Sequence, residues 1–261
     1  MNNNLIFQHF RPEEAPLIKN FSNLIEECNS EYRPILTDFL NPRERLIIKA
    51  LLHHNLPISF SSYGLFQTSE RQRGIFFPDY FQPQPADFAL SLLEISYASK
   101  FSQLRHSQIL GALLGNGLKR SVIGDIVTDG QRWQVVVEQQ VVDFLQLDIV
   151  QIGKTKVRLQ LINFEDAIEP KIAWQQLTMT VSSLRIDNLV SSTFQLSRAK
   201  AKELFTNGKV QLNWRLADQP QTELQQEDLV SVRGFGRFKL AKIGNFSKRG
   251  RLHVETLVLK K

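Results

Sequence analysis

The sequence predicts an α+β protein built in three parts. Helical and strand-like patterns are mixed along the 261 residues, and neither type dominates. A proline-rich segment, residues 77–85, interrupts these patterns and separates the first part from the second. Charge marks the third part, because the chain carries 17 Lys and Arg against 19 Asp and Glu up to Ser183, but 15 against 7 from Leu184 onward. We therefore expect domains at residues 1–77, 85–165 and 182–261.

The first part is predicted to be a small α+β domain. Residues 13–28 repeat apolar side chains at helical spacing. Asn41 and Pro42 are a helix cap and a first helical residue, so a second helix is expected to begin there and to end near His54. Two short strands are expected at residues 57–60 and 74–77, with turns at Tyr63-Gly64 and at residues 71–73.

The second part is predicted to have a ferredoxin-like fold. Its expected elements have the order βαββαβ and lie at residues 88–97, 103–115, 122–128, 132–138, 139–147 and 156–162, with Asp129-Gly130 as the hairpin turn. RNA-recognition motifs share this architecture and stack bases on aromatic side chains of the central strands. Trp133 lies near such a position, but the basic-Gly-aromatic run of those motifs is absent.

The third part begins with two predicted helices and a strand. Residues 184–190 repeat apolar side chains at helical spacing, and Ser197 is a good N-cap for a helix that stops at Asn207-Gly208. The strand at residues 209–213 follows. Arg198, Lys200 and Lys202 lie on the outer faces of the second helix, near backbone N–H groups of its first turn. Such a helix start suits phosphate.

These residues resemble the S-four-type RNA-binding domain, which is named for a protein of the small ribosomal subunit. The resemblance rests on Arg185-Ile186-Asp187, on Ser197-Arg198 twelve residues later, on Glu203-Leu204, and on Gly208-Lys209-Val210. The chain departs from the family pattern at Phe194 and Trp214, where the family often has glycine. The strands expected at residues 229–233, 235–243 and 252–259 would extend this module with a C-terminal hairpin.

A second resemblance rests on short segments spread over nearly the whole chain. They include Phe39 to Glu44, Glu70 to Arg73, Gly117 to Arg120, Gly124 to Ile126, and Ser231 to Phe238. In these segments the chain is similar to the YlmH family of bacterial RNA-binding proteins. The resemblance implies the three-part organisation. It also implies a link to ribosomes, to large subunits that carry peptidyl-tRNA in quality control, and through gene neighbourhood to cell division.

The predicted RNA-binding residues are cations of the third part, its helix cap and two cations of the second part. They are Arg185, Ser197, Arg198, Lys200, Lys202, Lys209, Arg215, Arg237, Lys248, Arg249, Arg251, Lys119 and Arg120. Other uses stay open. They are a solvated helix face for Arg198, Lys200 and Lys202, an ion pair with Asp187 or a cap of its own helix for Arg185, a helix C-terminus for Lys119 and Arg120, and a mobile loop for residues 248–251. Phe235 and Phe238 suit core packing more than base stacking.

The sequence favours a non-enzymatic RNA-binding protein of the cytoplasm. It lacks a dinucleotide or phosphate-binding glycine loop, a nucleophile elbow, and histidines at metal-binding spacing. We therefore expect no catalytic residues, no cofactor and no metal, and no membrane segment. The expected partners are structured ribosomal RNA or tRNA on the large subunit, bound by a monomer. The alternatives are a scaffold or regulatory protein linked to cell division and, with less support, an RNA-modifying enzyme.

Overall fold

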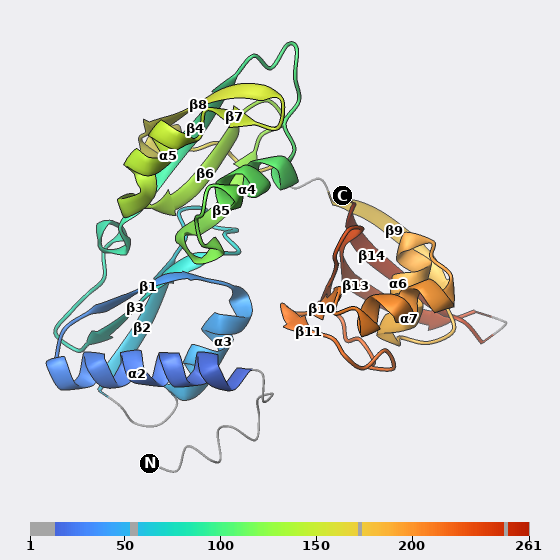
Figure 1. Cartoon of the computed structure of the whole chain (residues 1–261). Helices are drawn as coiled ribbons and strands as arrows, with labels where there is room; N and C mark the ends of the chain where they lie inside the picture. The colour runs from blue at the N-terminus through green and yellow to red at the C-terminus, as the bar shows by residue number, and fades with distance from the viewer. Residues whose placement is uncertain (1–13, 53–56, 172–173, 248–249, 261) are drawn as a thin grey trace. The chain divides into compact units, whose positions relative to one another are not determined.

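A computed structural model describes residues 14–52, 57–171, 174–247 and 250–260 (Figure 1). The chain forms two compact units, Met1–Lys171 and Ile172–Lys261. Helices and strands are mixed in both units, which confirms the α+β class. No helix of the described residues has the length and apolar character needed to cross a membrane.

The N-terminal part of the first unit is a three-stranded sheet with two helices. The elements are α2 (Ala15–Glu31), β1 (Ile35–Leu40), α3 (Pro42–Leu51), β2 (Ile58–Tyr63) and β3 (Gln72–Pro78), and the antiparallel strand order is β1-β3-β2. Asn41 caps α3 as predicted, because its side chain accepts a hydrogen bond from the Glu44 N–H at 3.0 Å while the Glu44 carboxylate accepts one from the Asn41 N–H. The predicted helix end near His54 lies outside the described residues.

Two features of this sheet differ from the prediction. Strand β1 was not expected, because its pattern contains a buried threonine, Thr37, instead of an apolar residue. The Thr37 hydroxyl accepts a hydrogen bond from the Gly74 N–H at 2.9 Å, which satisfies it inside the sheet. The turn expected at residues 71–73 is wrong, since Gln72 and Arg73 already belong to β3 and pair with β1.

The second part of the first unit has the predicted ferredoxin-like topology. Its elements are β4 (Leu90–Tyr97), α4 (His106–Gly115), β5 (Ile123–Thr128), β6 (Trp133–Glu138), α5 (Val142–Asp148), β7 (Gln151–Ile152) and β8 (Thr155–Ile162). Short 3₁₀ helices lie at Pro85–Phe88, Arg120–Val122, Gln139–Val141 and Phe164–Asp166. The strand order β5-β6-β4-β8-β7 is the ferredoxin order with β7 added at one edge. Helices α4 and α5 pack on one face through a core that includes Leu93, Ile109, Val135 and Leu145.

The other face of this sheet packs against the N-terminal part. Leu92 and Val136, both fully buried, form one core cluster with Phe39 and Ile75. A Cβ at Gly124 would lie 2.6 Å from the Phe39 ring, so the β5 backbone approaches this ring closely. Phe81, from the proline-rich segment, also packs on the cluster. Residues 77–85 are therefore an ordered part of the first unit, while the division into separate domains at this segment stays a prediction.

Charged groups join the same two parts, and we call this set the ionic cluster. It comprises Glu44, Arg45, Glu70, Arg71, Arg120 and Asp125. The Asp125 carboxylate accepts hydrogen bonds from the backbone N–H groups of Glu70 and Arg71 at 2.7 and 3.1 Å. The Arg71 guanidinium donates to the Phe39 carbonyl at 2.8 Å. Burial raises the pKa of Asp125, although these backbone hydrogen bonds oppose the rise.

The C-terminal unit is a six-stranded antiparallel sheet with two helices. The elements are β9 (Gln175–Val181), α6 (Ile186–Phe194), α7 (Arg198–Thr206), β10 (Val210–Leu212), β11 (Arg215–Leu216), β12 (Leu229–Val232), β13 (Gly236–Phe246) and β14 (Leu252–Lys260). The strand order is β11-β10-β12-β13-β14-β9. The predicted C-terminal hairpin is β13 and β14. Strand β9 was not predicted, because its partner β14 lies far away in the sequence.

Candidate nucleic-acid interface

The local sequence sets the start of α7. Gln195 has φ 54°, which turns the chain sharply after α6. The Ser191 hydroxyl donates to the Leu196 carbonyl at 2.6 Å, and the Leu196 N–H donates to the Ser191 carbonyl at 2.9 Å. The Ser197 hydroxyl then accepts a hydrogen bond from the Lys200 N–H at 3.2 Å, so Ser197 is the N-cap that the sequence predicted.

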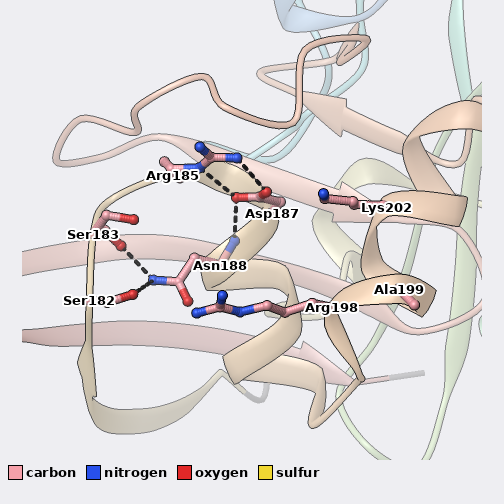
Figure 2. Close-up of a pocket in the computed structure, with 8 residues that line it drawn as sticks. All are labelled: Ser182, Ser183, Arg185, Asp187, Asn188, Arg198, Ala199 and Lys202. Atoms are coloured by element: carbon pink, nitrogen blue, oxygen red, sulfur yellow. Dashed lines mark hydrogen bonds and ion pairs between the residues drawn. The ribbon is translucent and has the colours of Figure 1, made fainter.

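A pocket of about 620 Å³, with several charged and polar residues in its lining, lies beside the first turn of α7 (Figure 2). Its lining comes from the segment before α6, the first turn of α6 and the first turns of α7. The lining residues are Ser182, Ser183, Arg185, Asp187, Asn188, Arg198, Ala199 and Lys202. The pocket thus combines the starts of two helices, where backbone N–H groups favour negative charge.

Three cations and one carboxylate set the charge of this pocket. Arg198 and Lys202 are one helical turn apart, so both side chains leave α7 on the same side. The Arg185 guanidinium donates two hydrogen bonds to the Asp187 carboxylate, at 2.7 and 3.1 Å. The formal charge of these four side chains is +2, so the pocket favours an anion.

The carboxylate stays ionised because cations surround it. Burial alone would raise the pKa of Asp187, but the hydrogen bonds and charge of Arg185, the Asn188 N–H and the charge of Lys202 together hold it below its ordinary value. The hydrogen bonds to Asp187 in turn raise the pKa of Arg185. Of the uses left open for Arg185, the structure shows the ion pair with Asp187 and a place on the pocket wall. Arg185 is the N-cap residue of α6, but its side chain makes no capping hydrogen bond.

Asn188 ties the segment before α6 to the helix. Its side-chain amide donates to the Ser183 carbonyl at 2.9 Å and to the Ser182 hydroxyl at 3.3 Å, as Figure 2 shows. Its backbone N–H donates to Asp187 at 2.8 Å. These contacts hold the Ser182 hydroxyl and the Ser183 backbone in the pocket lining, where the Ser182 hydroxyl can donate a hydrogen bond to an oxygen ligand.

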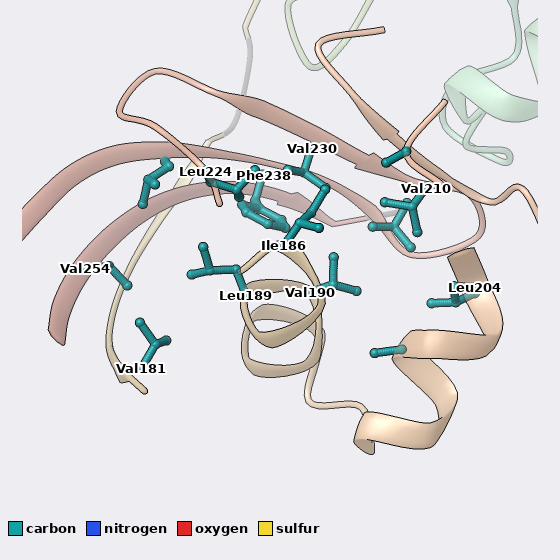
Figure 3. Close-up of a cluster of buried hydrophobic side chains, with 14 of the residues drawn as sticks. Val181, Ile186, Leu189, Val190, Leu204, Val210, Leu224, Val230, Phe238 and Val254 are labelled. Carbon is teal, nitrogen blue, oxygen red and sulfur yellow. The ribbon is translucent and has the colours of Figure 1, made fainter. Parts of the chain in front are cut away.

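A buried core lies between the sheet and the helices α6 and α7, whose first turns line the pocket (Figure 3). Ile186, Leu189 and Val190 of α6 and Leu204 of α7 are at most 2% exposed. They pack with side chains of the sheet, among them the fully buried Phe238. The pocket therefore rests on a rigid base, which favours preorganised binding. Phe238 therefore packs in the core, as the sequence favoured. Phe235 packs on Phe194, with ring centres 5.9 Å apart.

Lys200 differs from the other two cations predicted on this helix. Its ammonium group donates to both carboxylate oxygens of Glu203, at 2.9 and 3.0 Å. The hydrogen bond and charge of Lys200 lower the pKa of Glu203. Lys200 is not among the residues that line the pocket. Of the three predicted cations, Arg198 and Lys202 therefore line the pocket, while the charge of Lys200 is neutralised by Glu203.

The other predicted residues of the C-terminal unit that the structure describes lie outside the pocket lining. Lys209 follows α7, and Arg215 lies in β11. The Arg237 guanidinium lies over the Trp174 ring, 5.7 Å from its centre. Arg251 donates to the Thr180 carbonyl at 2.7 Å. Lys248 and Arg249 lie outside the described residues.

The two predicted residues of the first unit have different environments. Lys119 is exposed. The Arg120 guanidinium is turned inward and donates to the carbonyls of Ile123 and Gly124. Burial, with the charge of Arg71 beside it, lowers the pKa of Arg120 to about 10. These inward hydrogen bonds favour a role for Arg120 in the ionic cluster over contact with RNA.

Sequence reasoning missed the polar lining of the pocket. Ser182, Ser183 and Asn188 were not predicted, and Ala199 contributes by being small enough to leave room. One signal was present: Ser182 and Ser183 stand just ahead of the predicted helix and Asn188 stands near its start, and such side chains often form local hydrogen bonds with the backbone. The distance between the two helices could not be inferred, because it depends on the turn at Gln195.

Comparisons with known proteins agree with this arrangement. Residues 184–230 match the S4 domain, and residues 83–166 match the putative RNA-binding domain in YlmH. The chain is 37% identical over 250 residues to the ribosome-associated protein quality control protein P2 of Bacillus subtilis (strain 168), with 95% of this chain and 96% of the relative covered. The chain belongs to the YlmH family.

A solved structure of the same family extends the comparison. The cell division protein ylmH from Streptococcus pneumoniae is 36% identical, and the match covers 62% of this chain and 98% of that chain with a TM-score of 0.53. The YlmH resemblance stated from the sequence is therefore confirmed, together with the C-terminal S4 domain. The pocket lies inside the S4 match, apart from the two serines just ahead of it, and we call it the S4 pocket. The chain is thus an RNA-binding protein by family, with two matched segments of that kind.

Proposed function

We propose that the protein binds structured RNA of the large ribosomal subunit and acts in translation or ribosome quality control. The phosphates of this RNA bind at the S4 pocket, beside Arg198 and Lys202. The observation that carries this proposal is the pocket's charge of +2 at the start of α7. Phosphate contacts from cations and helix N-termini position a protein on RNA and supply most of its affinity. The name of the Bacillus subtilis relative, a ribosome-associated quality control protein, supports the ribosomal setting.

The proposal assigns no catalytic residue. Every polar side chain at the pocket has a binding or positioning use: Arg198 and Lys202 attract phosphate, and Asn188 holds the rim. The Asp187 carboxylate is paired with Arg185, and its lowered pKa makes it a poor general acid or base near neutral pH. The tRNA contact and the monomeric state that the sequence suggested remain parts of this proposal.

Co-sedimentation with purified ribosomal subunits tests the proposal. The full chain is expected to pellet with large subunits at moderate salt and to crosslink to their RNA. Reversing the pocket charge, as Arg198→Glu with Lys202→Glu, should abolish pelleting, because two attractions become two repulsions. Lys200→Glu is the matched control, since Lys200 lies outside the pocket on the same helix.

Two outcomes would contradict this function. Pelleting that survives charge reversal at the pocket would show that phosphate is not bound there. Crosslinks to ribosomal or other proteins in place of RNA would favour the scaffold alternative, for which the printed name of the Streptococcus pneumoniae structure, a cell division protein, is the supporting observation.

A further inference from the structure

The ferredoxin-like part of the first unit cannot use its sheet as an RNA-recognition motif does. Those motifs stack bases on the open face of their central strands. Here the central strands are β4 and β6, and on that face Leu92 and Val136 are buried beneath Phe39 and Ile75 of the N-terminal part. A contact between this part and RNA therefore has to use another surface.

Two segments of this part contain no Asp or Glu. They are residues 95–124 and 149–164, and their cations include Lys100, Arg105, Lys154, Lys156 and Arg158. Absence of carboxylates over such lengths leaves these cations without local neutralisation.

The fold brings the two acid-free segments together at one end of the sheet. Tyr97, the last residue of β4, pairs with Val157 of β8. Beyond it, the loop of residues 98–105 is joined to the β7–β8 turn by a hydrogen bond between the hydroxyls of Ser102 and Thr155. Figure 1 shows this loop between β4 and α4, beyond the ends of β7 and β8.

Phe101 is a highly exposed aromatic residue of this loop. It is 90% exposed, more than any other large apolar residue of the described chain. Its backbone N–H donates to the Ala98 carbonyl at 3.0 Å, so a turn presents the ring to solvent. Lys100 precedes it, and the Ser102–Thr155 hydrogen bond brings Lys154 and Lys156, the neighbours of Thr155, close to the loop.

Alternation along β8 directs its cations to the surface. Val157 and Leu159 point into the helix-covered core, so Lys156 and Arg158 lie on the opposite face and are exposed. An exposed aromatic ring among cations, with no carboxylate nearby in the sequence, is the combination that binds single-stranded nucleic acid, because the ring stacks on a base and the cations follow the backbone.

We propose that Phe101 is a stacking platform for an unpaired RNA base, and that Lys100, Lys154 and Lys156 bind the phosphates beside that base. This site rests on the proposed RNA-binding function and adds a second contact to it. The S4 pocket binds the phosphates of structured RNA, while the Phe101 site takes a single-stranded segment.

Binding of two RNAs to the full chain tests this site. One RNA is an oligouridylate of about 12 nucleotides, which has no stable secondary structure, and the other is a blunt hairpin without unpaired ends. Phe101→Ala should weaken oligouridylate binding by about 5-fold to about 150-fold, the range found for loss of one stacked base, and should leave hairpin binding unchanged. Phe101→Tyr should retain the affinity, because tyrosine keeps the aromatic face.

Two further variants complete the design. Lys154→Ala with Lys156→Ala should lower the salt dependence of oligouridylate binding by about 1.4 units of log–log slope, since each phosphate contact on a single strand contributes about 0.7. Leu147→Ala removes another exposed apolar side chain, 77% exposed on α5, and should change nothing.

The outcomes separate this inference from the proposed function. If Phe101→Ala binds oligouridylate like the parent, or if the parent binds the hairpin but not oligouridylate, the Phe101 site is overturned and the S4 pocket is unaffected. An equal loss on both RNAs would also overturn it, because stacking on an unpaired base cannot weaken a blunt hairpin. If Arg198→Ala with Lys202→Ala keeps full hairpin affinity, the proposed function fails instead.

Discussion

The S4 pocket and the ionic cluster of the first unit use the same residue types but differ in burial and in charge balance. In the ionic cluster, Asp125 accepts two backbone hydrogen bonds, and Arg120 is turned inward onto two carbonyls. In the pocket, Arg198 and Lys202 face a cavity, and one carboxylate opposes three cations. A buried and satisfied charge stabilises a junction, whereas an exposed and unbalanced one remains available to a ligand.

Arg120 and Arg198 illustrate the difference. Burial lowers the pKa of Arg120 to about 10, which shows that its charged form has lost solvation. Arg198 is exposed to solvent and lines the pocket. The sequence predicted RNA contact for both arginines. The residue type alone therefore does not show whether an arginine is buried against carbonyls or exposed to a ligand.

Asp125→Ala should lower the free energy of unfolding more than any other variant proposed here. A small effect on stability would contradict the structural role given to the ionic cluster. The change removes the acceptor of two backbone N–H groups and leaves nearby arginines without their carboxylate. We expect the free energy of unfolding of the first unit to fall by about 3 kcal/mol, measured by urea denaturation. RNA affinity of the folded protein should not change. A loss of RNA affinity with intact stability would show that the cluster belongs to the interface.

Arg120→Ala and Lys119→Ala compare neighbouring cations. Arg120→Ala should lower the free energy of unfolding by about 1.5–3 kcal/mol, because charged donors to two carbonyls are lost. Lys119→Ala should leave stability within about 0.5 kcal/mol of the parent, since Lys119 is exposed. Thermal or urea unfolding measures both. Equal effects of the two variants would contradict the inward role of Arg120.

Asp187→Asn should lower stability less than Asp125→Ala or Arg120→Ala does, and it should strengthen RNA binding. The pocket's charge would rise by one, so structured RNA should bind more tightly and with a steeper salt dependence. Stability should fall by about 1 kcal/mol or less, because the ion pair with Arg185 is partly exposed. Glu203→Gln is the control, since it neutralises a carboxylate that faces Lys200 outside the pocket. Weaker binding by Asp187→Asn would show that the carboxylate itself contacts the ligand.

Local signals in the sequence predicted much of the fold. The caps at Asn41 and Ser197 and the stop at Asn207-Gly208 are short-range effects, and the structure has the predicted helices at these places. The βαββαβ order was likewise readable from periodicity, because alternation and helical spacing repeat within each element.

Elements that depend on distant partners were missed. Strand β9 pairs with β14 from Leu252↔Val181 onward, and the sequence near residues 175–181 gives no local signal of that pairing. Strand β1 likewise depends on β3 and on a buried threonine hydroxyl. The same reason explains the site: Arg198 and Lys202 were predicted from helix position, but the inward turn of Arg120 depends on packing between two parts of the first unit.

The salt dependence of RNA binding tests the central claim most directly. The parent, Arg198→Ala with Lys202→Ala, and Lys200→Ala should be titrated with one structured ribosomal RNA fragment at several salt concentrations. If the pocket holds phosphate, the double variant should bind more weakly and lose about two units of log–log slope, while Lys200→Ala keeps the parent's slope. A folded double variant with the parent's affinity and slope would contradict the claim that this pocket binds RNA.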